Sequence, residues 1–369
     1  MRLLIAMFSL VLSLISCNGK TETILSYPDS SKDSLSRSSF RDTITITAVG
    51  DIMLGSNYPL PNGLPGVNIL DKTTPILKEN SQLIIGNLEG TLFDSGGVAK
   101  RCNNPNLCFV FRTPFSYGEY LKNAGFDFLS IANNHSGDFG NYGRKATQKN
   151  LDSLKISYAG LLNECEYAIK EKDGTRYAFI GAGHNGGLVS VKEYSAIKRI
   201  IKEVRNKADI VIVMFHGGAE GSAHQHVPKK REIYAGENRG NVYDFAHSCI
   251  DAGVDLVIGS GPHVTRAIEL YKNKFIAYSL GNFATYGNFN LKGPNGVAPI
   301  LKIKIDRNGN FISGNVISTE QTEDTGKGPS VDPDNKALNY LKELTKSDFP
   351  EGNLIITDNG EINKNYPVN

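Results

Sequence analysis

The segment FLSIANNHSGDFG (residues 128–140) leads from an apolar run directly into a group of polar side chains. The run has the composition of a buried strand, and Asn133, Asn134, His135 and Asp138 follow it within a few residues. Amide, imidazole and carboxylate groups are common ligands of divalent cations in proteins. The segment therefore predicts a strand whose carboxyl end delivers functional groups into a site, as strands of open α/β sheets do.

The same layout recurs elsewhere along the chain. Apolar runs in AVGDIMLG (48–55), LIIGNLEG (83–90), VIVMFHGGAE (211–220), LVIGSGPHV (256–264) and YSLGNF (278–283) are followed by Asp51, by Asn87 and Glu89, by His216 and Glu220, by His263, and by Asn282. Taken alone, Asp51 could cap a turn, Asn87 could face solvent and Asn282 could belong to a turn. The repetition favours one shared site, because strand ends far apart in sequence meet at one edge of an α/β sheet.

From Thr43 onward, short apolar runs alternate with stretches of helical pattern, which is typical of an α/β domain. We expect strands over 43–50, 83–89, 126–133, 156–160, 177–182, 209–216, 254–260, 274–281 and 299–306, and helices over 116–124, 143–154, 190–207 and 243–252. One domain over residues 43–320 accounts for these elements. A C-terminal tail, residues 321–369, is expected to pack on this domain, with a helix over 335–346.

The N-terminus has the features of an export signal. MRLLIAMFSLVLSLISC (residues 1–17) places Arg2 before an apolar stretch that is too short to span a bilayer but long enough for the core of a signal peptide. Its end resembles a bacterial lipobox with Cys17 as the lipidation site; an ordinary signal peptide with an unrelated cysteine is the alternative. Residues 18–42 are rich in Ser, Asp and Lys and predict a flexible tether. We therefore expect an extracytoplasmic bacterial lipoprotein, anchored to a membrane.

The net charge gives no reason to expect nucleic acid as a partner, and the cysteine content agrees with export. The formal net charge is +2 over 369 residues, so no global field favours nucleic acid as a partner. Cys102 and Cys108, in RCNNPNLCF, suit a small disulfide-closed loop in an oxidising compartment. A metal site at these two residues would lack a second cysteine pair. Cys165 and Cys249 have no evident mate and are expected to be buried thiols.

The motifs together carry a family resemblance. GDIMLG, NLEG, NNHSGDFG, HGGAE, GPHV and SLGNF, in this order across residues 50–283, are similar to those of the CapA family of bacterial poly-γ-glutamate capsule proteins. The resemblance implies a calcineurin-like metallophosphatase fold, an α/β fold built as a four-layer α/β/β/α sandwich. It also implies a membrane-attached role in making, exporting or anchoring poly-γ-glutamate or a related anionic envelope polymer, alongside other capsule synthesis proteins.

The same resemblance assigns roles to the strand-end residues. Metallophosphatases of this type hold two metals, and their pattern implies metal binding by Asp51, Glu89, Asn134, His216 and His263 and proton transfer by His135. Asp138 and Glu220 are expected to be further catalytic residues. Glu220 shares a face with His216 if that stretch is helical. Met53 and Gly261 stand where the pattern has histidines, and neither offers an imidazole. We expect one divalent ion (Mn²⁺, Mg²⁺ or Zn²⁺) held tightly, or two held weakly.

Four residues are expected to contact the substrate. Asn87 and Asn282 lie in strand-end motifs, and Arg112 and Arg266 each follow a strand-like run close to a motif. A fixed guanidinium can hold a carboxylate of an anionic polymer through two parallel hydrogen bonds. His184 is expected to be structural.

The sequence leaves three functions open. The first is a metal-dependent hydrolase or transferase acting on a γ-glutamyl or phosphate-containing envelope polymer. The second is a non-catalytic accessory protein that binds the polymer, and the third is a secreted phosphoesterase. The two missing histidines favour binding without catalysis. The Asn134–His135 pair favours catalysis, because a pure binding site needs no positioned proton donor.

Overall fold

The computed structural model describes residues 43–59, 63–101, 108–287, 289–322 and 328–365. The predicted signal peptide 1–17 with Cys17, the tether 18–42 and Cys102 lie outside the described residues. Cys108 is disulfide-bonded, and Cys165 and Cys249 are free thiols. Across the described ranges, the structure contains no helix with the length and apolar character needed to cross a membrane.

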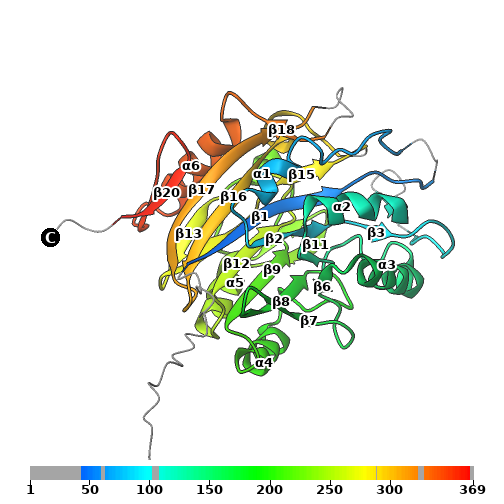
Figure 1. The fold of residues 1–369 in the computed structure, drawn as a ribbon, viewed down its shortest axis with the longest axis horizontal. Coiled ribbons are helices and arrows are strands. Elements are labelled where there is room, and N and C mark those ends of the chain that lie inside the picture. Colours follow the sequence, from blue (N-terminus) through cyan, green and yellow to red (C-terminus); the bar gives the residue numbers. More distant parts are fainter. Residues whose placement is uncertain (1–42, 60–62, 102–107, 288, 323–327, 366–369) are drawn as a thin grey trace, which may run out of the picture. The chain divides into compact units, whose positions relative to one another are not determined.

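The first large sheet is organised around the apolar strand that begins at Thr43. Its strands lie in the order β19 (Leu354–Ile356), β20 (Glu361–Lys364), β17 (Phe311–Glu320), β16 (Val297–Asp306), β1 (Thr43–Met53), β2 (Leu83–Leu88), β5 (Phe128–Ser130) and β6 (Ser157–Ala159). β1, β2, β5 and β6 run parallel, and β16 pairs antiparallel with β1. β15 (Asn282–Thr285) adds a parallel pairing to the end of β1, and β18 (Ser330–Val331) pairs with β17. Figure 1 shows β1 and β16 side by side.

The second large sheet is parallel at its centre. Its strands lie in the order β13 (Ile268–Tyr271), β14 (Lys274–Ala277), β12 (Leu256–Ser260), β9 (Ile210–His216), β8 (Thr175–Gly183) and β7 (Tyr167–Lys172). β14, β12, β9 and β8 are parallel to one another, and the edge strands β13 and β7 pair antiparallel. Two small two-stranded sheets are formed by β3 (Thr91–Leu92) with β4 (Arg112–Thr113), and by β10 (Glu232–Tyr234) with β11 (Glu237–Gly240).

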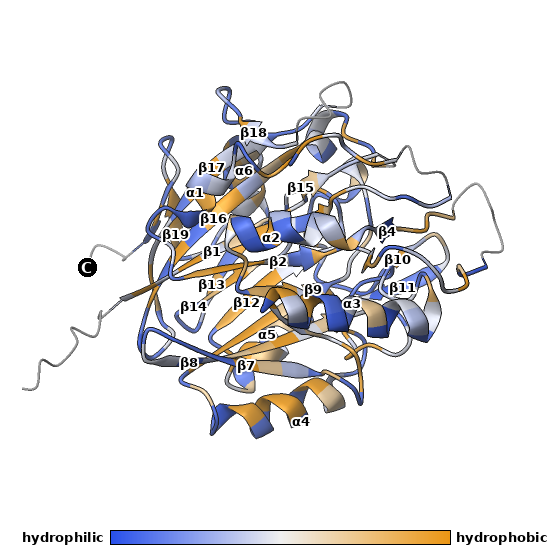
Figure 2. Cartoon of the chain, turned by 45° about the vertical axis from the view of Figure 1, so that its right-hand side comes forward, coloured by the Kyte–Doolittle hydropathy of each residue, from blue (hydrophilic) through white to orange (hydrophobic). Residues whose placement is uncertain are grey.

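The two large sheets face each other across an apolar core. Because side chains alternate between the faces of a strand, β9 sends Ile210, Ile212 and Met214 into the core between the sheets, and Val211, Val213 and Phe215 into a second core on its other face. The rings of Phe128 in β5 and Phe179 in β8 stack between the sheets at a centroid distance of 4.5 Å. Figure 2 shows this apolar character along the strands.

Helices cover the outer faces of both sheets (Figure 1). α1 (Thr74–Lys78), α2 (Gly118–Ala124) and α3 (Gly140–Leu154) pack on the first sheet, and α4 (Tyr194–Arg205) and α5 (Val242–Asp251) pack on the second. α4 is amphipathic and buries Ile197, Ile200, Ile201 and Val204. Asn241 caps α5 by accepting a hydrogen bond from the backbone N–H of Asp244. The layers confirm the predicted α/β/β/α sandwich.

The C-terminal segment contributes to the same cores. α6 (Lys336–Asp348) places Leu338 and Leu341 in the core between the sheets and Leu344 in the outer core of the second sheet. β19 and β20 extend the first sheet beyond β17. Short 3₁₀ turns, η2 (Phe115–Tyr117), η3 (Ser222–His224) and η4 (Gly293–Gly296), lie in the connections.

Candidate metal centre

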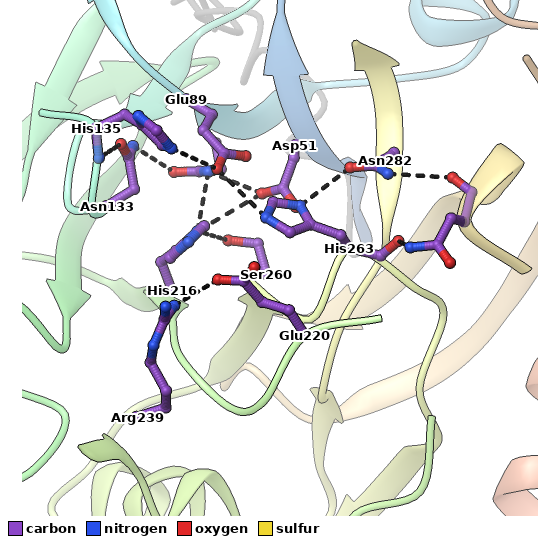
Figure 3. A network of polar contacts seen from close by, with 12 residues as sticks. Asp51, Glu89, Asn133, His135, His216, Glu220, Arg239, Ser260, His263 and Asn282 are labelled. Atoms are coloured by element: carbon purple, nitrogen blue, oxygen red, sulfur yellow. Dashed lines mark hydrogen bonds and ion pairs between the residues drawn. The ribbon is translucent and has the colours of Figure 1, made fainter. Parts of the chain in front are cut away.

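The carboxyl ends of strands from both sheets meet at one place. Figure 3 shows Asp51, Glu89, His135, His216 and His263 pointing toward one another. Asp51 lies near the end of β1, and Glu89 and His135 come after β2 and β5 of the first sheet. His216 ends β9 and His263 comes after β12 of the second sheet. The convergence expected from the repeated strand-end layout is thus present in the structure.

Three of these residues form a group suited to a cation. One ligand atom from each of Glu89, His216 and His263 can be chosen so that the three atoms lie within 4.8 Å of one another. Glu89 is 1% exposed, and neither of its carboxylate oxygens has a hydrogen bond; Nε2 of His216 is also buried without one. Burying such groups without partners is unfavourable unless they are paired or coordinate a metal. Their chemistry and orphaned atoms fit a divalent cation.

Asp51 holds both imidazoles in place. It is fully buried, and its Oδ1 accepts a hydrogen bond from Nδ2 of Asn87 at 2.8 Å. Its Oδ2 lies 3.0 Å from Nδ1 of His263, and its Oδ1 lies 3.7 Å from Nδ1 of His216. Burial alone would raise the pKa of Asp51, but hydrogen bonds and charge from the two histidines outweigh it and hold the pKa below its usual range.

The remaining ionisable groups respond to burial in opposite directions. Burial raises the pKa of Glu89 well above its usual value, although the charge of His263 opposes this effect. Burial lowers the pKa of His216. For His263 the burial effect is overcome by the charge of Glu89 and the contact with Asp51, and its pKa rises to about 10. A cation bound among these residues would favour the ionised carboxylate and the neutral imidazoles, as ligand groups require.

His135 is oriented by a carboxylate behind it. Its Nδ1 lies 2.9 Å from Oδ2 of Asp138, which leaves Nε2 on the side of Glu89, 4.0 Å from Oε1. Asp138 also accepts the backbone N–H of Phe111 at 2.7 Å and lies 2.6 Å from Nζ of Lys100. Burial lowers the pKa of His135, and Asp138 acts against that shift. Asp138, expected to be catalytic, therefore has the contacts of a residue that positions His135.

Neighbouring asparagines complete the polar network. Asn133, which the sequence reasoning assigned no role, donates to Oδ1 of Asn87 (3.1 Å) and to the backbone C=O of Leu88 (2.7 Å), and accepts from the backbone N–H of His135 (3.1 Å). Its buried amide could have been suspected from its place at the end of β5. Oδ1 of Asn134 is buried without a hydrogen bond.

Asn87 and Asn282, expected to contact substrate, are engaged within this network. Nδ2 of Asn87 donates to Asp51, and its Oδ1 accepts from Asn133. Oδ1 of Asn282 lies 3.0 Å from Nδ1 of His263, and its Nδ2 donates to a backbone C=O. The register explains this, because β1 pairs Asp51 with Asn87 on one side and with Asn282 on the other. Both amides therefore support the ligand residues.

Arg266, expected to contact substrate, has structural contacts. Its side chain is fully buried, and its guanidinium donates to both carboxylate oxygens of Glu232, at 3.0 and 2.7 Å. It also donates to the backbone C=O groups of Ala219 and His224. These contacts engage four of the five N–H groups of a fully buried side chain within the chain itself. Arg266 instead anchors the first strand of the β10–β11 hairpin.

The guanidinium of Arg112, which was also expected to contact substrate, makes contacts with other side chains of the chain. Its guanidinium lies 5.2–5.8 Å from the ring centroids of Tyr58, Phe93 and Phe139. Its Nε donates to Oδ1 of Asn57 at 2.7 Å. The cation–π contacts and this hydrogen bond account for its position without a substrate.

Glu220 reaches the site by a different route from the one expected. The stretch after β9 is a loop, in which Gly218 and Gly221 have φ values of 93° and 92°, so the helical turn is absent. Oε1 of Glu220 accepts a hydrogen bond from Nη1 of Arg239 at 2.6 Å. The carboxylate remains close enough to Glu89 to contribute to the raised pKa of that residue.

At the two positions where the family pattern has histidines, Met53 and Gly261 are tightly surrounded by neighbouring atoms. Sδ of Met53 is buried and accepts the backbone N–H of Gly55 at 3.2 Å. Gly261 has a φ of 110°, and a Cβ built on it would lie 2.8 Å from the backbone nitrogen of Gly217. A larger residue at position 261 would thus be strained and would collide with the loop after β9. The described residues supply the Glu89–His216–His263 group as the candidate cation ligands.

Fold and site together define an α/β/β/α sandwich with a candidate metal centre at the shared carboxyl edge of its sheets. Residues 45–286 match the family described as "Bacterial capsule synthesis protein PGA_cap". The chain belongs to this family. The matched region includes every strand that delivers a residue to the candidate metal centre.

Curated relatives carry corresponding descriptions. The chain is 29% identical over 263 residues to the "Capsule biosynthesis protein CapA" of Bacillus anthracis, covering 66% of this chain and 60% of that protein. It is 28% identical over 262 residues to the "PGA biosynthesis protein CapA" of Bacillus subtilis (strain 168), covering 66% of this chain and 63% of that protein. The chain thus spans less than two thirds of the length of these relatives.

Solved structures with a similar arrangement were also found. A hypothetical protein from Thermus thermophilus matches with a TM-score of 0.48 and 17% identity, over 76% of this chain and 100% of that one. A putative 5′-nucleotidase from Staphylococcus aureus matches with a TM-score of 0.45 and 15% identity, over 82% of this chain and 58% of that one. TM-scores below 0.5 at such identities do not support a shared activity.

Proposed function

We propose that the chain is an extracytoplasmic lipoprotein that acts on poly-γ-glutamate or a related anionic envelope polymer through a metal-dependent hydrolase or transferase site. Family membership and the descriptions of the Bacillus relatives support the polymer class and a role beside other capsule synthesis proteins. The signal-like segment that ends at Cys17 supports the location and the lipid anchor.

The observation that carries the catalytic proposal is the placement of the His135–Asp138 pair beside the orphaned carboxylate of Glu89. A divalent cation held by Glu89, His216 and His263 would polarise a carbonyl and lower the pKa of water. In amide cleavage, an oxygen or amine nucleophile bonds to the γ-carbonyl carbon, the C–N bond breaks, and the leaving nitrogen takes a proton. Nε2 of His135 faces the cluster and is placed to accept the proton that the nucleophile loses and to pass it to the leaving nitrogen, while Asp138 keeps the ring oriented.

A non-catalytic function is favoured by one specific observation. The positions of Met53 and Gly261 are filled by packing, so the ligand set is smaller than that of a two-metal phosphatase. A protein with such a site could bind the nascent polymer at the membrane face through the cation and leave it intact. The two functions differ in whether His135 is needed.

Elemental analysis of the full chain tests the metal centre. We expect stoichiometric divalent metal in the wild type and its loss in the His216→Ala/His263→Ala variant. His226→Ala, whose side chain is 66% exposed, is the matched histidine control and should retain the metal. Equal metal content in the wild type and the double variant would contradict the proposed centre.

Turnover separates the enzyme from the binder. Chain length of poly-γ-glutamate is followed with metal-loaded wild type and with His135→Asn. Shortening or transfer that disappears in His135→Asn supports the catalytic function. Binding of the polymer without turnover in the wild type supports the accessory function.

Membrane fractionation of Cys17→Ala tests the anchor, since release of the variant into the soluble extracytoplasmic fraction is expected.

A further inference from the structure

A second polar group lies beside the candidate metal centre, on the β10–β11 hairpin. Arg239, in β11, is 5% exposed, and Figure 3 shows it next to His216 with its guanidinium paired to Glu220. Its Nη1 donates to that carboxylate at 2.6 Å. Its Nε is buried without a hydrogen bond. Nε and Nη2 form the edge of the guanidinium that can hold a carboxylate by two parallel hydrogen bonds. Nε on this edge has no hydrogen-bond partner.

His184 presents a second orphaned atom toward the same place. It follows β8 and is 2% exposed. Its ring is stacked with that of His216 at a centroid distance of 6.0 Å, and its Nδ1 lies 3.3 Å from the backbone C=O of that residue. Because Nδ1 carries the proton that faces this C=O, Nε2 is an acceptor, and it is buried without a hydrogen bond. A residue that the sequence suggested to be structural thus directs an unused polar atom away from the metal ligands.

A carboxylate of the chain itself stands between these two orphaned groups. Oε2 of Glu237 lies 3.2 Å from Nη2 of Arg239 and 3.7 Å from Nε2 of His184. The side chain of Glu237 is 53% exposed, although the side chains of its two neighbours are almost completely buried. This exposed carboxylate reaches Nη2 of Arg239 but leaves Nε without a hydrogen bond, and it faces Nε2 of His184, which is an acceptor and cannot donate to it. Such an arrangement is that of an occupant that can leave.

We propose that Arg239 forms a carboxylate-binding subsite next to the metal centre, which Glu237 occupies until a substrate carboxylate displaces it. The inference rests on the proposed function and names what the site recognises. In a γ-linked glutamate chain, a short aliphatic segment separates the reactive amide carbonyl from a free α-carboxylate. Arg239 would hold that carboxylate while the amide lies at the cluster of Glu89, His216 and His263. The subsite would therefore favour a γ-linked chain with free α-carboxylates over a polymer without charged groups.

The hairpin that carries Arg239 is fixed against the metal centre. The backbone C=O of Arg239 accepts the N–H of Gly218, two residues after His216, at 3.0 Å. At the other strand of the hairpin, Glu232 accepts the N–H of Ala219 and pairs with the buried Arg266. A guanidinium held in this way loses little conformational freedom on binding, which favours affinity and selectivity.

Calorimetric binding to the full, metal-loaded chain tests the subsite. The probes are a γ-linked glutamate oligomer, the same oligomer with its α-carboxylates amidated, and glutarate. We expect Arg239→Lys to weaken binding of the carboxylated oligomer by about tenfold to a hundredfold, the usual effect of losing hydrogen bonds to a charged group, and to leave the weaker binding of the amidated oligomer unchanged. Arg231→Lys, an exposed arginine just before the hairpin, is the matched control and should bind as the wild type does.

Glu237→Gln provides a readout that does not depend on a buried substitution. Because Glu237 is exposed and competes with the ligand, its neutralisation should tighten binding of the carboxylated oligomer and of glutarate. Unchanged binding of both probes in Glu237→Gln and Arg239→Lys would overturn the subsite. Glutarate binding that depends on Arg239, with no binding of either oligomer to the wild type, would uphold the carboxylate subsite and overturn the proposed polymer.

Discussion

Glu89 is a carboxylate that the fold buries without a hydrogen bond; its nearest charged partner is Nε2 of His263, 3.5 Å from Oε1, so a bound cation would satisfy it further. We expect a divalent cation to raise the free energy of unfolding of the wild type by about 2–3 kcal/mol at a hundredfold excess over its Kd. In Glu89→Gln this stabilisation should be lost, because the amide offers no charge to the cation. Thermal unfolding with and without Mn²⁺ or Zn²⁺ measures it. An equal metal-induced shift in both proteins would exclude Glu89 as a ligand.

The His263 side chain links stability to pH in the metal-free protein. Its pKa rises from 6.5 to about 10 in the folded state, against the effect of burial, because of Glu89 and Asp51. A raised folded-state pKa gives a contribution that is fully present below pH 6.5 and is lost as the pH rises toward 10. In chelator, the difference in unfolding free energy between the wild type and His263→Gln should therefore shrink from pH 6.5 to 10. Denaturant titrations at several pH values measure it, with His226→Gln as control; a growing difference would contradict it.

At the scale of elements, the parallel strands and their polar ends followed from the sequence. Each strand that delivers a ligand is a run of apolar residues that ends at a glycine or a polar group, and the structure places these ends together. The β10–β11 hairpin was not predicted, because EIYAGENRG (232–240) lacks an apolar alternation. Its sheet is held by tertiary contacts, in particular the Arg266–Glu232 pair. Because the pairing of Arg266 with Glu232 depends on these tertiary contacts, the sequence did not show whether the guanidinium was buried in a pair or available to a ligand.

This buried pair allows a direct test of the role of Arg266. Arg266→Met should lower the free energy of unfolding by about 3–5 kcal/mol, because it leaves Glu232 buried without its partner. Arg266→Met/Glu232→Met should be less destabilised than the single variant, since both charges are gone. Urea unfolding measures both. A double variant that is as unstable as the sum of two single variants would show that the two side chains act independently.

At the scale of the whole molecule, the candidate site depends on how the two sheets are placed against each other. Glu89 and His135 come after strands of the first sheet, whereas His216 ends a strand of the second sheet and His263 comes after another. The core between the sheets, including the stacked rings of Phe128 and Phe179, sets that placement. The identity of the strand-end residues could be read from the sequence. Their distances could not, because they result from packing between strands far apart in the chain.

This dependence predicts that two core substitutions of similar cost differ in their effect on metal binding. Phe128→Ala opens a cavity between the sheets, and Phe245→Ala opens one in the outer core under α5. Each should lower the free energy of unfolding by about 3–5 kcal/mol. Metal affinity should fall in Phe128→Ala, because the sheets can shift and spread ligand atoms that now lie within 4.8 Å of one another. Metal affinity should be unchanged in Phe245→Ala, because the core between the two large sheets stays packed. Equal metal affinities in two folded variants would mean that the cluster is set locally by its loops.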